Sequence, residues 1–479
     1  MSRRLPALVI VMVSVAALIV AARSTPDPTI ATFAAVRTPW MPAAPAGDQL
    51  SDSWFCPGVP ATGEEGVGGE ILIGNRSAAP VTADIQWLGG AGAAIDETVV
   101  VEPFSRTVLD ATTRLTAPFV SAVVEINGGP AIVEQRVIHP AGRPVSPCAD
   151  DTSSTWYLAE GFTVGGSLNN IVLTNPFDDA AIVNIGFATA DGSRVPAGYQ
   201  GLPVPPRSVR VLDLGAPGAG AQGEDRLAVQ VEATRGQLVV GRSQHFLAGN
   251  RLGYTMSLAA PALRDQWWFA DGDKRSGVTE RFSIYNPTGS TVEVDAIFLG
   301  VAAIADVEPI TVPARQVVTF DPGLVATLPE GRHATVFSTR AEPSIVVERV
   351  VTETIDGRPG SSVVLGAPPS PTGYVASTWH LVAGPEAATS AALVIFNPDN
   401  TPGTLTVQSV GPDGLEPVPG LESVEIGAAA IATIDLTAEQ AIGRELVVTS
   451  TGRIFVERSL PSGSGEGRTS SWLVPAAPS

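Results

Sequence analysis

Short apolar or alternating segments recur along the chain, and turn-forming residues separate them. In one stretch they cover 156–162, 169–174, 181–189, 200–213, 227–234, 237–246 and 253–260. Such segments, bounded by Gly, Pro, Asn or Asp, are typical of β-strands. Asp-Gly pairs, as at Asp191-Gly192, supply the positive φ that tight hairpins need. The pattern predicts an all-β chain.

The strands belong to an internal repeat with a period of about 110 residues. Four landmarks return in the same order in each copy. They are a tryptophan that leads a strand (Trp54, Trp156, Trp267, Trp379), an asparagine that ends a strand (Asn75, Asn175, Asn286, Asn397), a proline-marked turn (Pro103, Pro205, Pro313) and an arginine that ends a β-branched run (Arg136, Arg242, Arg349, Arg458). In the fourth copy the turn weakens to Ile426-Gly427-Ala428-Ala429.

These landmarks predict four repeats, at 51–150, 151–264, 265–375 and 376–479. About seven short strands per repeat favour tandem immunoglobulin-like antiparallel β-sandwiches. The alternative is a β-propeller with two blades per repeat, which would require an eighth strand in each copy.

The N-terminus carries an export signature. Arg3 and Arg4 precede an uncharged apolar run at 5–22, so 1–23 is predicted to be a signal anchor or a signal peptide. The run is long enough to span the cytoplasmic membrane once and to leave the rest extracytoplasmic. The alternative is secretion after cleavage. Five prolines at 24–50 predict an extended Pro/Ala-rich stalk.

Net charge narrows the choice of partners. The formal charge is −19 and the pI about 4.6, so most of the surface would repel nucleic acid. An envelope polymer or an envelope protein remains a candidate partner.

The two cysteines, Cys56 and Cys148, lie near the two ends of the first repeat. An even pair in an exported protein predicts a disulfide that joins the first strand to the last. Two buried free thiols are the alternative. No cluster of His and Cys suggests a metal site.

We find no residue pattern that predicts catalysis, a cofactor or a metal. The four repeat arginines, Arg136, Arg242, Arg349 and Arg458, are the candidates for a specific role. One interpretation is a row of ion pairs within or between repeats, with Glu160 and Asp271 as partners in two copies. The other is a row of guanidinium groups that binds an anionic polymer.

The histidines are better explained by structure. His139 and His245 each fall three residues after a repeat arginine, which indicates a shared strand end, and His380 occupies an aromatic position. The acidic residues at Asp178-Asp179 and Asp399 follow the strand-ending asparagines. Turn formation explains them better than calcium binding does.

The series Trp156-Tyr157-Leu158-Ala159-Glu160-Gly161, then Asn-Pro, Val-Pro-Pro-x-Ser and Val-Val-x-Arg resembles a repeat of actinobacterial surface proteins. With the N-terminal anchor, the chain resembles an uncharacterised actinobacterial family, domain of unknown function 5719, over about residues 51–479. The resemblance implies a location and an architecture, and no catalytic residues. The first and fourth repeats lack the acidic residue of this motif.

Two functions remain open from the sequence. One is a non-catalytic, membrane-tethered scaffold or binding module of the cell envelope, with the second and third repeats as the first place to seek a ligand. The alternative is an accessory protein or hydrolase of cell-wall glycan, which requires two facing carboxylates.

Overall fold

The computed structural model describes residues 42–45, 51–301, 305–340, 342–355, 358–368, 376–386, 391–461 and 468–476. These residues belong to one compact unit and form an all-β fold, as predicted. The helical segments among them are single 3-10 turns: η1 (Gly90–Gly92), η2 (Ala111–Thr113), η3 (Val164–Gly166), η4 (Ala197–Tyr199), η5 (Pro322–Leu324) and η6 (Glu439–Ala441). No helix in the described ranges has the length and apolar character needed to span a membrane. The predicted anchor at 5–22 lies outside the described residues.

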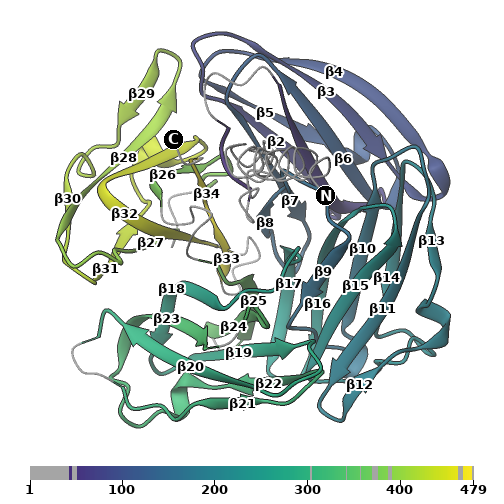
Figure 1. Cartoon of the computed structure of the whole chain (residues 1–479). Helices are drawn as coiled ribbons and strands as arrows, with labels where there is room; N and C mark the ends of the chain where they lie inside the picture. Colours follow the sequence, from purple (N-terminus) through teal and green to yellow (C-terminus); the bar gives the residue numbers. More distant parts are fainter. Residues whose placement is uncertain are drawn as a thin grey trace, which may run out of the picture. The chain divides into compact units, whose positions relative to one another are not determined.

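Each repeat contributes two sets of antiparallel strands (Figure 1). We call the set that contains the repeat's leading tryptophan the Trp sheet. The set whose strand ends at the repeat's asparagine is the Asn sheet.

The first repeat has eight strands: β1 (Ser51–Ala61), β2 (Gly68–Asn75), β3 (Val81–Leu88), β4 (Ala94–Val101), β5 (Ser105–Asp110), β6 (Ala117–Asn127), β7 (Ala131–Ile138) and β8 (Val145–Pro147). The Trp sheet has the order β1-β6-β3-β4, and the Asn sheet has the order β5-β2-β7-β8. The chain therefore passes repeatedly from one sheet to the other.

The second repeat consists of β9 (Thr155–Leu158), β10 (Leu168–Asn175), β11 (Ala181–Thr189), β12 (Gly192–Arg194), β13 (Leu202–Val204), β14 (Ser208–Asp213), β15 (Leu227–Arg235), β16 (Val239–Ala248) and β17 (Arg251–Leu258). Its Trp sheet has the order β12-β11-β15-β9, with β13 also on β11, and its Asn strands follow the order β14-β10-β16-β17. The predicted strand at 200–213 is two strands, β13 and β14, which lie in different sheets.

The third repeat consists of β18 (Gln266–Lys274), β19 (Val278–Asn286), β20 (Val292–Leu299), β21 (Ile310–Val312), β22 (Gln316–Phe320), β23 (Gly331–Thr339), β24 (Val346–Ile355) and β25 (Arg358–Leu365). The orders are β18-β23-β20-β21 and β25-β24-β19-β22. A parallel bridge between Leu252 and Gly360 joins its Asn sheet to that of the second repeat.

The fourth repeat consists of β26 (Ala376–Leu381), β27 (Ala392–Phe396), β28 (Gly403–Gly411), β29 (Gly414–Pro417), β30 (Val424–Ile426), β31 (Ile431–Asp435), β32 (Leu446–Pro461), β33 (Arg468–Trp472) and β34 (Val474–Pro475). The long strand β32 belongs to both sheets. Its first half pairs with β26 and β28, and its second half pairs with β27 and β33.

The strand-ending asparagines explain why that landmark repeats. Asn175 is fully buried, and its Nδ2 donates to the carbonyls of Asp179, Val204 and Pro205 at 2.8, 3.2 and 3.0 Å. One amide thereby joins the turn after its own strand to the proline-marked turn. Asn75, Asn286 and Asn397 make corresponding bonds in their repeats.

The proline-marked turn has the same backbone conformation in all four copies. Among the described residues, the non-glycine positions with positive φ are Phe104, Arg207, Arg315 and Ala429, at 48°, 44°, 56° and 47°. A residue other than glycine in the left-handed conformation costs free energy. The hydrogen bonds of the strand-ending asparagine hold the turn in this conformation. The fourth repeat keeps this conformation at Ala429 although it has lost the proline.

The predicted disulfide between Cys56 and Cys148 is confirmed. Both cysteines are fully buried. At the equivalent pair of positions the other repeats place Leu158 with Ala259 and Phe269 with Gly366. A β-carbon added to Gly366 would lie 2.8 Å from the Phe269 ring, so large and small residues alternate across this contact. The disulfide replaces this apolar packing with a covalent link.

The described end of the predicted stalk packs on the repeats. Ala43 and Ala44 are buried; Ala44 N donates to Pro475 O at 2.7 Å, and Ala43 N donates to Asp150 Oδ2 at 3.1 Å. Residues 42–45 are therefore not part of a free stalk, because their backbone finds partners in the first and fourth repeats.

Candidate functional site at the repeat junctions

Three of the four junctions between repeats contain a buried ion pair. The pairs are Arg242–Glu348 at 2.8 Å, Arg349–Glu457 at 2.6 Å and Arg458–Glu134 at 2.8 Å. Each arginine pairs with a glutamate of the next repeat, and the fourth repeat pairs back to the first. All six side chains are essentially inaccessible to solvent.

The strand register explains how one repeat serves two junctions. Glu348 and Arg349 are consecutive residues of β24, so their side chains point to opposite faces of the sheet. Glu348 pairs with the second repeat, and Arg349 pairs with the fourth. Glu457 and Arg458 have the same arrangement on β32.

Backbone amides also donate hydrogen bonds to the carboxylates of these glutamates. Glu348 Oε2 accepts hydrogen bonds from the N–H groups of Ala159 and Glu160, both at 2.7 Å. Ala270 N donates to Glu457 Oε1 at 2.6 Å, and Ala383 N donates to Glu134 Oε2 at 2.7 Å. These donors follow the leading tryptophan of each repeat by three or four residues. They reduce the cost of burying the carboxylates.

The first repeat departs from the predicted arginine row. In the Asn sheets, Ile171 lies opposite Arg242, and its counterpart Ile71 lies opposite Gln135. The structural equivalent of the other arginines is therefore Gln135, and Arg136 is one residue out of register. Its guanidinium pairs with Glu70 and Glu386 at the edge of the repeat.

The junction between the first and second repeats has lost both halves of the ion pair. Gln135 stands at the arginine position, and Gly241 stands at the glutamate position. Of the usual amide donors, Pro57 has no N–H, and Gly58 N donates to Gln135 Oε1 at 3.2 Å. A β-carbon on Gly241 would lie 2.7 Å from Pro57. Close packing replaces the charge pair at this junction.

The predicted partners Glu160 and Asp271 have other roles. Glu160 pairs with Arg251 at 2.5 Å, and Asp271 pairs with Arg332. Arg242 Nη1 instead donates to the backbone carbonyl of Glu160. The expected partners lie in the same repeat as the arginine, whereas the observed glutamates come from the next repeat.

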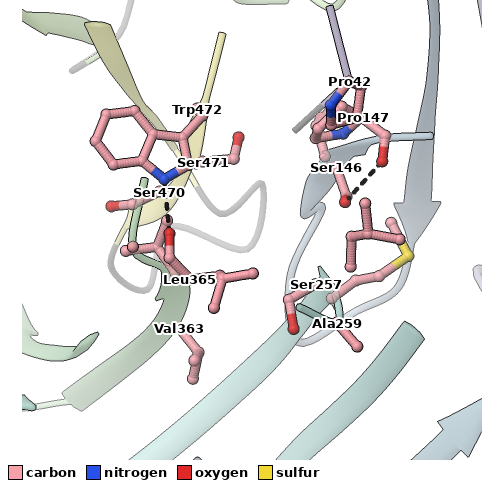
Figure 2. Close-up of a pocket in the computed structure, with 15 residues that line it drawn as sticks. Pro42, Ser146, Pro147, Ser257, Ala259, Val363, Leu365, Ser470, Ser471 and Trp472 are labelled. Carbon is pink, nitrogen blue, oxygen red and sulfur yellow. Dashed lines mark hydrogen bonds between the residues drawn. The ribbon is translucent and has the colours of Figure 1, made fainter. Parts of the chain in front are cut away.

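A small pocket is lined by the closing strands of all four repeats (Figure 2). Its volume is about 50 Å³, which is room for a few water molecules or a small apolar group. The lining comes from residues 145–147, 256–259, 363–366 and 470–472, with Pro42. Trp472 is its largest side chain, and its indole N–H donates to Leu365 O at 2.6 Å.

Two of the ion pairs contact residues that line this pocket. Arg242 Nη2 donates to the hydroxyl of Ser257 at 2.9 Å, and Arg458 Nε donates to that of Ser471 at 2.6 Å. Both serines line the pocket. Two hydroxyl groups of the lining are thus held by the arginines of the junctions.

A second, polar pocket of about 320 Å³ belongs to the third repeat alone. Four carboxylates line it: Asp273, Glu280, Asp321 and Glu330. Asp273 pairs with Arg275 at 2.6 Å, Glu280 lies 3.0 Å from His333 Nε2, and Asp321 accepts a hydrogen bond from Gly323 N at 2.8 Å. Three of the four therefore contact groups of the same repeat.

The structure brings together two histidines that the sequence placed only at equivalent strand ends. The His139 and His245 rings lie 4.7 Å apart, and His139 stacks on Tyr254 at 4.5 Å. Burial, with a smaller contribution from His245, lowers the pKa of His139 to about 4. Burial also lowers the pKa of His245, and the two rings pack the first repeat on the second.

No group of His, Cys, Asp or Glu within the described ranges has the geometry of a metal site. The signal that could have identified the junctions was the Glu-Arg dipeptide, present in the third and fourth repeats, together with Glu134 in the first.

A sequence model described as "Family of unknown function (DUF5719)" matches residues 139–241 and 255–472. No curated protein matches the chain. Among solved structures, one titled Thermotoga maritima 1070 is 13% identical and covers 22% of this chain and 92% of its own, with a TM-score of 0.20. A tetra-tandem repeat from the extending region of a large adhesion protein is 14% identical and covers 89% of this chain and 100% of its own, with a TM-score of 0.12.

Proposed function

Because the chain belongs to the family of unknown function DUF5719, we propose that it is a non-catalytic scaffold or binding module of the cell envelope. In this proposal the apolar run at 5–22 tethers it to the cytoplasmic membrane, and the repeats face the extracytoplasmic side. Release after cleavage of that run is the alternative.

The proposal rests on the location of the residues that repeat most regularly along the chain. The leading tryptophans, the strand-ending asparagines and the arginines Arg242, Arg349 and Arg458 are all buried. The asparagines join turns within a repeat, and the arginines join neighbouring repeats. Repetition of buried residues serves the folding of a duplicated unit. These features favour a rigid display platform.

We interpret the two sheets of each repeat as an immunoglobulin-like sandwich. The order β1-β6-β3-β4, in which strands distant in sequence are neighbours, supports this interpretation. The eight strands of the first repeat leave a propeller with two blades per repeat as the alternative.

The proposal locates any contact with an envelope polymer outside the arginine row. Arg242, Arg349 and Arg458 are paired and inaccessible, so their guanidinium groups cannot reach a polymer from solvent. The exposed turns of the second and third repeats are the surface to test first.

Two measurements test this function. Protease treatment of intact cells should digest the repeats if they lie outside the cytoplasmic membrane. Cross-linking of the full chain in cells should capture envelope material. Arg242→Gln should affect the stability of the fold more than it affects this capture. Protection of the repeats in intact cells, with digestion only after lysis, would contradict the proposal.

The polar pocket of the third repeat supports hydrolysis of cell-wall glycan as the second candidate function. Inverting glycosidases place two carboxyl groups roughly 6.5–9.5 Å apart, and Glu330 and Asp321 line the same pocket. The discriminating assay incubates the full chain with isolated cell-wall glycan and measures released reducing ends. Release that is lost in Asp321→Asn and Glu330→Gln would establish the hydrolase and overturn the scaffold.

A further inference from the structure

The junction between the fourth and first repeats differs from the other three at four structurally equivalent positions. Arg76 stands where the other repeats have Pro176, Pro287 and Pro398, and Gly74 stands where they have Thr174, Tyr285 and Phe396. His380 replaces an aromatic residue, Phe55, Tyr157 or Trp268. By strand register, Glu445 replaces Ser121, Ala228 or Ala334.

The other junctions fill this space with side chains. Trp268 of the third repeat lies 5.9 Å from the Phe396 ring of the fourth, and it stacks on Phe455 at 5.1 Å. Between the first and second repeats, the hydroxyl of Thr174 donates to Pro57 O at 2.6 Å. Larger residues than Gly74 thus occupy its position at each of the other junctions. At the fourth–first junction the carboxylate of Glu445 fills the space beside Gly74, because an added β-carbon there would lie 2.5 Å from both of its oxygens.

A cavity of about 330 Å³ lies at the fourth–first junction, beside Arg76 and His380. Its lining includes Arg76, Thr378, His380, Leu415, Val447 and Thr449. One part of its wall is apolar, from prolines and aliphatic side chains. Another part presents a guanidinium, an imidazole and two threonines.

The polar part contains unused hydrogen-bonding groups. Arg76 Nη2 and His380 Nδ1 are buried and have no hydrogen-bond partner among the described residues. Among the charged groups around Arg76, Glu445 has the largest electrostatic effect on it, but no hydrogen bond joins the two side chains in the described part of the chain. Buried groups without partners are costly, so such groups point to water or a ligand.

We propose that the cavity at the fourth–first junction is a binding site for a small carboxylate with a compact apolar body. Arg76 binds the carboxylate through its planar pair of N–H groups, a geometry suited to two oxygens. His380 and the threonines add hydrogen bonds. Leu415, Val447 and the prolines contact the apolar body.

This site goes beyond the proposed function, because it lies between the fourth and first repeats and does not depend on the exposed turns of the second and third. A carboxylate in this position would also link the fourth repeat to the first, since Arg76 comes from the first repeat and His380 from the fourth. Binding should therefore stabilise the fold.

The experiment titrates the purified full chain with acetate, butanoate and hexanoate, with inorganic phosphate for comparison. Isothermal titration calorimetry and the thermal unfolding midpoint are the two measurements. We expect the longer carboxylates to bind and to raise the midpoint, and phosphate to bind more weakly. Absence of carboxylate binding by both measurements, or tighter binding of phosphate, would overturn the proposal.

Three variants locate the site. Arg76→Gln should weaken carboxylate binding by about tenfold or more, the loss of one charge-assisted contact. His380→Phe, which introduces the residue type of the equivalent Phe55, should also remove binding. It provides a second variant that we expect to fold. Arg235→Gln, at an exposed position of β15, is the matched control and should bind normally. Equal binding by Arg76→Gln and His380→Phe would place the ligand elsewhere and sink the proposal.

Discussion

Arg458 and Glu134 lie 324 positions apart in the chain and form an ion pair at 2.8 Å in which neither side chain is accessible to solvent. The pair joins the last repeat to the first. The backbone bond between Ala44 and Pro475 adds a second link between the two ends of the described unit. Closure of the repeat series therefore rests on contacts that no single repeat contains.

Removing one partner of this pair should be costly. Arg458→Gln leaves Glu134 charged and buried, and we expect the free energy of unfolding to fall by about 3–5 kcal/mol. Denaturant unfolding of the full chain measures the loss. Arg453→Gln is the control, because Arg453 and Asp399 form an exposed ion pair. Loss of such a pair should lower the free energy of unfolding by about 1 kcal/mol or less.

A double-mutant cycle separates the pair from general disruption. Glu134→Gln together with Arg458→Gln should cost less than the sum of the two single changes, because neither charge is then left unpaired. Additive losses would show that the two side chains do not interact.

The first–second junction should tolerate no added atoms at Gly241. Gly241→Ala places a β-carbon 2.7 Å from the Pro57 side chain, and overpacking of this kind costs about 1–3 kcal/mol. Gly289→Ala is the matched control, since no atom lies within 4 Å of its added β-carbon. Thermal unfolding compares the two. Equal midpoints would mean that Pro57 moves freely and that this junction is loosely packed.

Much of the fold was predictable from local patterns. The strands at 169–174, 181–189 and 227–234 lie within one residue of β10, β11 and β15 at each end. The predicted strand at 200–213 contains the proline-marked turn at Pro205-Pro206. The left-handed backbone at Arg207 breaks it and sends its two halves to different sheets.

Ion pairs at the repeat arginines were predictable from the sequence, but the register of Arg136 and the identity of the glutamate partners were not. The prediction aligned Arg136 with the others because each ends a β-branched run, yet the ladder places Gln135 at that position. A slip of one residue moves a side chain to the other face of a strand. The glutamate partners come from neighbouring repeats, and a single sequence does not specify which repeats touch.

The disulfide should contribute substantially to stability. Cys56 and Cys148 close a loop with a sequence separation of 92, and loss of such a native link typically costs about 2–5 kcal/mol. We expect Cys56→Ser with Cys148→Ser to lower the unfolding midpoint, and reductant to lower that of the natural chain only. Peptide mapping without reduction checks the bond directly; separately alkylated Cys56 and Cys148 peptides would contradict it.

Glu445 should make stability depend on pH. Burial raises the pKa of its carboxyl from 4.5 to about 7; the charges of Arg76 and Arg106 oppose this, and that of Glu134 adds to it. The folded chain thus holds this proton more tightly than the unfolded chain does. Its contribution is fully present below about pH 4.5 and is lost as the pH rises to about 7.

Glu445→Gln should remove that dependence and should stabilise the chain at pH 8 by an amount on the order of 3 kcal/mol at most. Asp150, whose pKa burial also raises to about 7, should keep part of the slope in this variant. Urea unfolding at a series of pH values from 4.5 to 8 measures it, with the exposed Glu425→Gln as control. An unchanged slope in Glu445→Gln would show that this carboxyl gains a compensating partner when it ionises.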